Sequence, residues 1–431
     1  MTERRRWLAL LVLCLGDLMI VLDTTIVNVA LPSIRADLGF SETSLAWVVN
    51  GYLLTFGGFL LLAGRMGDLF GHRRLFLIGL TVFTSASLAC GLAGSPEFLV
   101  GARAVQGLGG AVVSVVALSL IMTMFTEPAE RAKAMGFIGF VIAGGGSIGV
   151  FLGGLLTDAL DWHWIFLVNI PIGAAVIVLC FVLVPVGTGQ RGSMESRAQS
   201  PLMPLALFRR RSFAAVNIVC VLWAAALFAW FFLAALYLQL VLGYSPLGVG
   251  LAFLPANLIM GAFSLGLSER IVLRWGIRAP LVIGMLLVGA SLALFARAPV
   301  GGNFAVDVLP GMILLGLGMG MSFNPVLLAA MSEVEPSEAG LASGVANTSF
   351  MMGGALGLAV LASLADARSS GLTSAGVGRL AALTGGYHAA FVVAAAFAAT
   401  AAVVGALLLR SGDAPTPHKD REVLSAHAAL D

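Results

Sequence analysis

The chain has 431 residues, of which 59% are hydrophobic and only 11% are charged, and its mean hydropathy of +1.00 excludes an ordinary soluble globule. The formal net charge of +2 is too small to indicate a nucleic-acid partner. These values predict a polytopic membrane protein.

Twelve apolar segments are long enough to cross the hydrocarbon core of a membrane, which takes about 20 helical residues. The first six are predicted at 7–30, 45–63, 75–94, 98–125, 134–157 and 164–186, and the second six at 212–242, 247–267, 279–297, 307–331, 340–365 and 386–410. A segment rich in Gly, Ser and Pro separates the two sets. The predicted domains are an N-terminal six-helix bundle (1–186), a cytoplasmic linker (187–211), a C-terminal six-helix bundle (212–410) and a cytoplasmic tail (411–431).

Basic residues gather in alternate loops, and positively charged loops stay in the cytoplasm. Arg4, Arg5 and Arg6 precede the first span, and Arg73 and Arg74 follow the second. Both termini are therefore expected in the cytoplasm. Two six-helix halves with a site between them at the midplane are typical of secondary transporters.

The first span contains two carboxylates, Asp17 and Asp23. A carboxylate at this depth is costly unless it is paired, hydrated or protonated, so each is a candidate proton carrier. On a helix, Asp17, Thr24 and Asn28 fall within about 20° of one direction, whereas Asp23 is rotated by about 120°. We expect the first three to line a central cavity and Asp23 to face a neighbouring helix. Two alternatives stay open: Asp23 is only a structural partner of Arg103 or helix backbone, and Asp17 only snorkels to water.

Arg103 is the one lysine or arginine in the interior of a predicted span, and Gln106 follows it by about one turn. A guanidinium favours the ionised form of a nearby Asp, and its removal favours protonation, which makes the pair a candidate coupling device. The alternative is a structural arginine bonded to helix carbonyls. In the later spans, Asn324 and Asn347 are the candidates for the substrate cavity, together with Asn28 and Gln106.

The fifth span carries glycines four residues apart, a spacing that lets helix backbones approach closely. They are Gly145, Gly149 and Gly153, with Gly136 upstream and Gly154 adjacent. Ordinary helix packing explains the spacing by itself.

Five short motifs occur in order along the chain: "LDTTIVNVALP" (22–32), "GRMGDLFGHRR" (64–74), "RAVQGLGGA" (103–111), the run from Gly136 through "GVFLGG" (149–154), and "WIFLVNIPIG" (164–173). In this order they resemble the drug:proton antiporters of the major facilitator superfamily, in the branch usually built with 14 helices. The resemblance implies an all-α membrane protein of the bacterial inner membrane, with two six-helix bundles around a central cavity. It also implies proton-coupled export of hydrophobic or cationic small molecules by alternating access, as in multidrug or antibiotic efflux, with no cofactor beyond the proton gradient.

The resemblance also implies roles for particular residues. Asp23 is the coupling carboxylate on the matched motif, and Arg103 faces the cavity and assists proton exchange. The segment after the second span is a gating loop, in which Asp68 meets the start of the eleventh helix near Ser337 to Leu341. The gating residues are Gly64, Asp68, Gly71, Arg73 and Arg74.

Three departures from the family pattern are visible. Val150 stands where relatives commonly have proline, so the kink expected there is absent. Phe350 and Met351 stand where relatives often have Arg-Gln, which predicts a more apolar lining. The two helices that this branch inserts between its halves are missing, and the linker occupies their place.

Several function classes are excluded or left open by the sequence. An ATP-driven pump needs a phosphate loop ending in Gly-Lys, but Lys133 and Lys419, the only lysines, follow alanine and histidine. An intramembrane enzyme needs a converged nucleophile or metal set, and none is evident.

No disulfide or metal site is expected of the four cysteines, which lack paired spacing: Cys14, Cys90, Cys180 and Cys220. A lipid or metabolite exporter and a non-transporting ligand sensor remain alternatives. The expected partners are a small amphipathic substrate, protons and membrane lipid, with the chain acting as a monomer.

Overall fold

The computed structural model describes residues 3–184, 210–263, 267–331 and 339–408, and the regular structure in these ranges is helical. The first set of helices comprises α1 (Glu3–Leu38), α2 (Glu42–Phe70), α3 (His72–Gly91), α4 (Pro96–Met124), α5 (Pro128–Ala159), α6 (Trp164–Leu167) and α7 (Asn169–Leu183). The second comprises α9 (Arg211–Leu236), the π-helix η2 (Tyr237–Val241), α10 (Pro246–Ala262), α11 (Ser268–Trp275), α12 (Arg278–Phe295), the π-helix η4 (Phe304–Val308), α13 (Leu309–Met331), α14 (Ala339–Ser374) and α15 (Arg379–Leu408).

Each of the predicted spans falls on these helices, with α6 and α7 together covering the sixth. Within the described residues, ten helical stretches are long and apolar enough to cross a membrane. The other two predicted spans lie on α5, which has 32 residues, and on α10, which has 17. The prediction of a multi-pass helical membrane fold is therefore confirmed. The predicted linker (187–211) falls almost entirely outside the described residues, and the predicted tail (411–431) lies wholly outside them.

The short loop predicted between the second and third spans, residues 64–74, is reduced in the structure to a single-residue turn. Helix α2 continues to Phe70 and α3 begins at His72, so Gly71 alone forms the turn. Gly71 has a φ of 88°, which a residue with a side chain rarely adopts. Most of the segment predicted as a gating loop is therefore helical.

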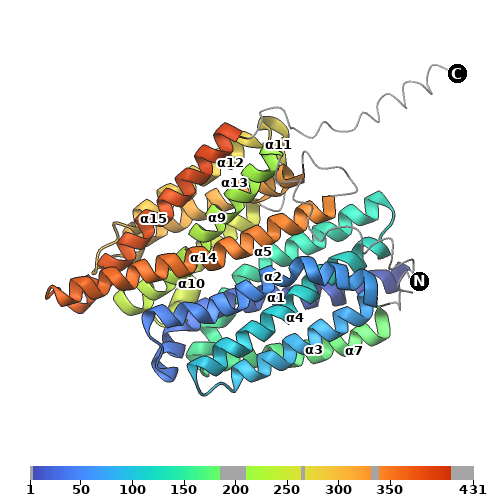
Figure 1. Cartoon of the computed structure of the whole chain (residues 1–431), viewed down its shortest axis with the longest axis horizontal. Helices are drawn as coiled ribbons and strands as arrows, with labels where there is room; N and C mark the ends of the chain where they lie inside the picture. Colours follow the sequence, from blue (N-terminus) through green and yellow to red (C-terminus); the bar gives the residue numbers. More distant parts are fainter. Residues whose placement is uncertain (1–2, 185–209, 264–266, 332–338, 409–431) are drawn as a thin grey trace.

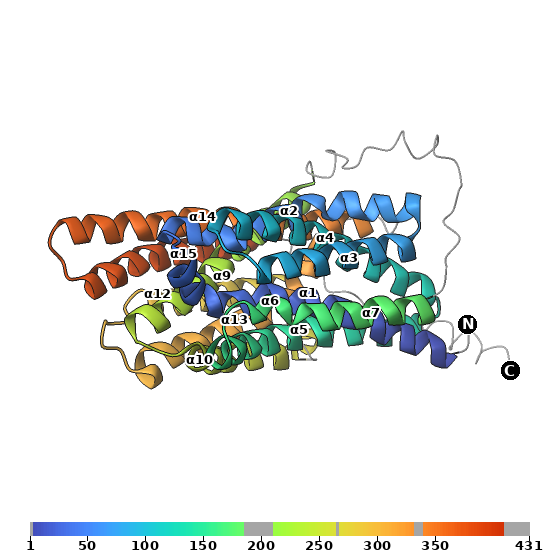
Figure 2. The ribbon, with the colours of Figure 1, turned by 90° about the horizontal axis from the view of Figure 1, so that it is seen from below.

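The two sets of helices form two bundles that meet along two seams. Figures 1 and 2 show α14 of the second bundle beside α2 of the first, and α10 beside α5. Gln239 adds a polar contact between the bundles, because its Nε2 donates a hydrogen bond to the carbonyl of Val29 at 2.7 Å. In both figures the hairpin of α14 and α15 projects beyond the other helices at one end.

The glycines of α5 let this helix approach α1 closely. A Cβ built on Gly149 would lie 3.0 Å from the carbonyl oxygen of Leu22, and one on Gly153 would lie 2.6 Å from that of Ile26. A Cβ on Gly145 would meet the side chain of Val21 at 2.9 Å. Close packing by these three glycines is therefore present, as the spacing indicates.

The other two glycines singled out on α5 behave differently. Gly154 faces the second bundle, where an added Cβ would lie 2.5 Å from the carbonyl oxygen of Pro246 in α10. Gly136 has nothing within 4 Å of an added Cβ and takes no part in the packing. Helix α5 continues without a break through Val150, in line with the absent proline.

Candidate functional site

Asp23 of α1 lies at the centre of a polar cluster inside the first bundle, and none of its surface is exposed. Arg103 of α4 donates from Nη1 to Asp23 Oδ2 at 2.5 Å, and Gln106 donates from Nε2 to Asp23 Oδ1 at 2.7 Å. Arg103 Nη1 also reaches Gln106 Oε1 at 2.7 Å. One turn of α4 therefore supplies both a counter-charge and a hydrogen-bond donor to the same carboxylate.

Two further side chains complete what we call the Asp23 network: Asp23, Ser87, Arg103, Gln106 and Asn169. Asn169, at the start of α7, donates from Nδ2 to Asp23 Oδ1 at 3.2 Å and to Ser87 Oγ at 2.9 Å. Gln106 Nε2 reaches the same Ser87 oxygen at 2.9 Å. Hydrogen bonds thus join α1, α3, α4 and α7 at one buried point. A polar group left without a partner there would lower the stability of the fold.

The remaining contacts of Arg103 also lie within the first bundle. Its Nε donates to the carbonyl of Val48 at 2.9 Å. Its guanidinium carbon lies 4.4 Å from the ring centre of Tyr52 and 5.6 Å from that of Phe166. Aromatic faces attract a cation, so these rings and the Asp23 carboxylate together stabilise the buried charge.

The structure agrees with the direction expected for Asp23 and differs from the cavity-facing position expected for Arg103. Asp23 faces neighbouring helices, as its rotation from Asp17 indicates. Arg103 was expected to face the central cavity, yet it is fully buried and is not among the residues that line the described cavity. Gln106, expected in the substrate cavity, lies in the Asp23 network instead. The reason is that Nε and Nη1 of Arg103 donate to acceptors within its own bundle.

Sequence reasoning missed Ser87 and Asn169 as members of this network. Asn169 lies inside the motif 164–173 and is an amide in an otherwise apolar stretch, which was a usable signal. Ser87 carried none, because a lone serine in an apolar helix usually bonds to its own backbone. Its Oγ instead donates to the carbonyl of Phe166 at 3.2 Å.

We expect Asn169→Ala to lower the free energy of unfolding by about 1 kcal/mol, because it removes two buried interhelical hydrogen bonds at once. Thermal unfolding of the full chain in detergent checks this. The matched control is Asn28→Ala, since the Asn28 amide donates to carbonyls of its own helix, those of Thr24 and Thr25. Equal losses in the two variants would contradict the interhelical role of Asn169.

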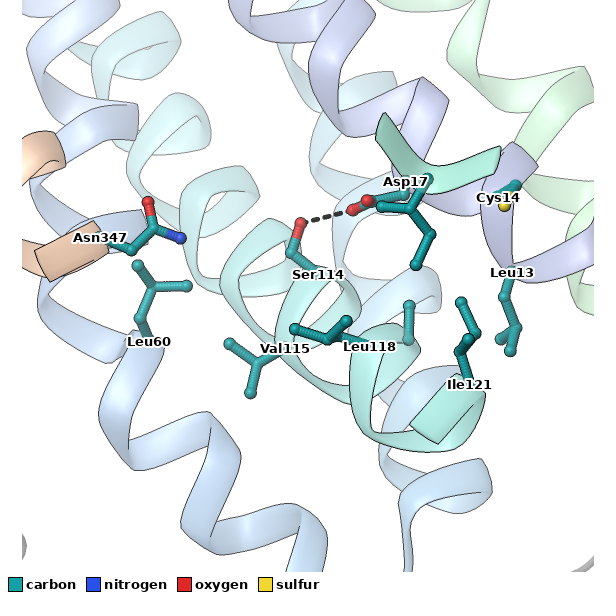
Figure 3. A pocket seen from close by; sticks show the side chains of 11 residues that line it. Leu13, Cys14, Asp17, Leu60, Ser114, Val115, Leu118, Ile121 and Asn347 are labelled. Atoms are coloured by element: carbon teal, nitrogen blue, oxygen red, sulfur yellow. Dashed lines mark hydrogen bonds between the residues drawn. The ribbon is translucent and has the colours of Figure 1, made fainter. Parts of the chain in front are cut away.

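The second carboxylate of α1, Asp17, lines a cavity of about 160 Å³. Ser114 of α4 donates from Oγ to Asp17 Oδ1 at 2.6 Å. Figure 3 shows these two side chains pointing toward one another, with Asn347 of α14 across from them. The other lining residues are Leu13, Cys14, Leu60, Val115, Ala117, Leu118, Ile121 and Ile138. The described cavity is therefore apolar except for a few groups, and Asn347 brings the second bundle to it.

Of the predicted cavity residues, Asp17 and Asn347 line the described cavity and the others do not. Asn28 is 5% exposed and bonded to its own helix. Asn324 lies half-buried on α13.

The apolar character predicted around Phe350 is present in the second bundle. The Phe350 ring centre lies 5.2 Å from that of Trp223 and 5.8 Å from that of Phe228. Three aromatic side chains from α9 and α14 therefore pack together where the family resemblance implies Arg-Gln.

The structure describes only some of the residues of the predicted gate. Arg73 donates from Nη2 to the carbonyl of Phe181 at 2.7 Å, and Arg74 is exposed. The side chain of Asp68 and the residue Ser337 lie outside what the structure describes, so the gate stays a prediction. Among the described residues, no group of three His, Cys, Asp or Glu side chains is placed to hold a metal ion.

Comparison with known proteins places the chain among transporters. A family model described as Major Facilitator Superfamily matches residues 13–358. A puromycin resistance protein of Streptomyces alboniger is 37% identical, with 94% of this chain and 90% of that protein covered. A cephamycin export protein of Amycolatopsis lactamdurans is 36% identical over 93% and 92%, and a lincomycin resistance protein of Streptomyces lincolnensis is 35% identical over 84% and 85%.

Solved structures support the same fold. A bacterial homologue of the human lysosomal transporter Spinster, in an inward-facing and unoccupied conformation, aligns with a TM-score of 0.74 at 18% identity, covering 97% of this chain and all of that one. A D-xylose-proton symporter aligns with a TM-score of 0.75 at 17% identity, covering 95% and 99%. At these identities the likeness shows the fold alone.

Proposed function

Because the chain belongs to the major facilitator superfamily, we propose that it exports small amphipathic molecules across the bacterial inner membrane in exchange for protons. The relatives with which it shares about a third of its residues are antibiotic resistance and export proteins. The observation that carries the coupling part of the proposal is the Asp23–Arg103 pair, a titratable group and its counter-charge sealed together inside the first bundle.

In the proposed cycle, Asp23 is ionised while Arg103 lies beside it. A movement that draws Arg103 away leaves a carboxylate unpaired in a low-dielectric interior, and uptake of a proton relieves that cost. When the pair forms again, the proton leaves. Substrate binding biases this equilibrium only to the extent that it favours one arrangement of the helices over the other.

Helix α1 is the element that links the proton to the substrate. It carries Asp23 on one side and Asp17, which lines the cavity, on another. Helix α5 packs on α1 through Gly149 and Gly153 and on α10 through Gly154. A shift between the bundles at the α5–α10 seam is therefore passed to α1. In this proposal both termini are cytoplasmic, and the turn at Gly71 lies on the same side.

The lining of the described cavity favours drug-like substrates over the alternatives. Its walls are mostly aliphatic, with one carboxylate, one hydroxyl and one amide, as suits a hydrophobic or cationic molecule. A sugar or nucleoside would need more polar partners. Export of a lipid or metabolite, and ligand sensing without transport, are the outcomes that the experiment must separate from drug export.

The test is uptake of ethidium, a lipophilic cation, into inverted membrane vesicles with an imposed pH gradient, acid inside. We expect accumulation that stops when nigericin collapses the gradient and that is absent from vesicles lacking the chain. Uptake that ignores the gradient would indicate uniport instead. Absence of ethidium uptake, together with absence of transport of a panel of neutral antibiotics, would favour the sensor or another cargo.

A further inference from the structure

Among the residues that the structure describes, Asp17 has no charge partner. Ser114 donates one hydrogen bond to its Oδ1, and no basic side chain among the described residues forms an ion pair with it. The other carboxylate of α1, Asp23, differs because Arg103, Gln106 and Asn169 surround it. A carboxylate bordered by aliphatic walls is costly unless a cation or a proton joins it.

The space beside Asp17 fits a group of modest size. A cavity of about 160 Å³ is close to the roughly 150 Å³ that holds a benzene molecule in an engineered protein core. Leu60, Val115, Leu118 and Ile121 supply aliphatic contacts. The site therefore matches a small ring or branched alkyl group that carries a positive charge at one end.

We propose that this cavity binds the amine-bearing end of the transported molecule, and that Asp17 is the residue that selects a cationic amine over a neutral molecule of the same shape. The inference rests on the proposed function and adds the substrate class to it. Ser114 positions the Asp17 carboxylate by its hydrogen bond. The amide of Asn347 meets the bound molecule from the second bundle.

This assignment gives Asp17 a role in substrate binding and Asp23 a role in proton coupling. The Asp23 carboxylate is occupied by Arg103 and has no exposed surface, so it is closed to a substrate in this arrangement. Asp17 borders the cavity. Because the site takes side chains from both bundles, an occupant touches α1, α4 and α14 together, and its binding bears directly on how the bundles sit against each other.

The test is calorimetric binding to the full chain in lipid nanodiscs, with two probes of the same shape. Benzyltrimethylammonium carries a permanent positive charge, and neopentylbenzene replaces its nitrogen by carbon. We expect the parent to bind the cation about tenfold more tightly than the neutral probe, after subtraction of binding to empty nanodiscs. Asp17→Asn is expected to remove that preference while leaving affinity for the neutral probe unchanged.

Two further variants keep the result interpretable. Asp17→Glu retains the charge and is expected to retain most of the preference. Asp158→Asn removes a carboxylate from an exposed position near the end of α5 and is expected to change nothing. An unchanged preference for the cation in Asp17→Asn would overturn the inference, and so would a parent that binds both probes equally. If the preference depends on Asp17 but the parent fails to transport in the vesicle assay, the proposed export fails while the binding site stands.

Discussion

Asp23→Asn is expected to reduce gradient-driven ethidium uptake to below about 1% of the parent rate, because a neutral amide can neither carry the proton nor match the buried Arg103 charge. In either orientation of the amide, its nitrogen would face a donor, Arg103 Nη1 or Gln106 Nε2, so two donors would stand where a donor and an acceptor lie now. Uptake into inverted vesicles, normalised to the amount of folded protein, measures the loss.

A double variant separates coupling from stability. Removing one member of a buried pair costs about 3–5 kcal/mol, whereas removing both charges is often neutral. We therefore expect Asp23→Asn and Arg103→Met each to unfold at a lower temperature than the parent, and the combined variant to recover most of the difference. It should remain unable to use the gradient. Gradient-driven uptake by the double variant would mean that the pair is only structural.

Gly153→Ala is expected to destabilise the first bundle by about 1–3 kcal/mol and to remove most transport, because one methyl group has no room there. The added carbon would lie 2.6 Å from the carbonyl oxygen of Ile26, a backbone atom that cannot rotate away. Helices α1 and α5 would have to move apart. Thermal unfolding in detergent and vesicle uptake, measured on the same preparation, record the two effects.

The control for this substitution lies on the same helix. Gly136 has nothing within 4 Å of an added Cβ, so Gly136→Ala is expected to leave stability unchanged or to raise it slightly by the gain in helix propensity. Matching results for the two variants would contradict the close α1–α5 contact. Normal stability with lost transport in Gly153→Ala would instead assign the glycine to movement between the helices.

The positions of the spans were predictable because each one is a continuous apolar run. The direction in which Asp23 points was also predictable, since a rotation of about 120° from Asp17 follows from helix geometry alone. Depth was not. Asp17 and Asn28 share a direction but lie about 16 Å apart along the helix, and the described cavity extends only to Asp17.

The partners of the buried charges were harder to predict than the charges themselves. That Arg103 needs an acid follows from its place inside a span, but the network also depends on Ser87 and Asn169, which come from other helices. Such contacts are set by how helices distant in sequence pack together. A short loop with tight glycine turns was expected between α2 and α3, but the charged residues in it hid the fact that both helices continue to either side of Gly71.

The most direct test of proton-coupled export is to follow both fluxes in one preparation. Proteoliposomes with a trapped pH indicator and an imposed ethidium gradient report proton movement and substrate movement together. Antiport predicts that protons move opposite to ethidium in the parent, and that Asp23→Asn keeps any downhill ethidium flux but loses the proton signal. Ethidium movement without a proton signal in the parent, or protons moving in the same direction as ethidium, would contradict the account.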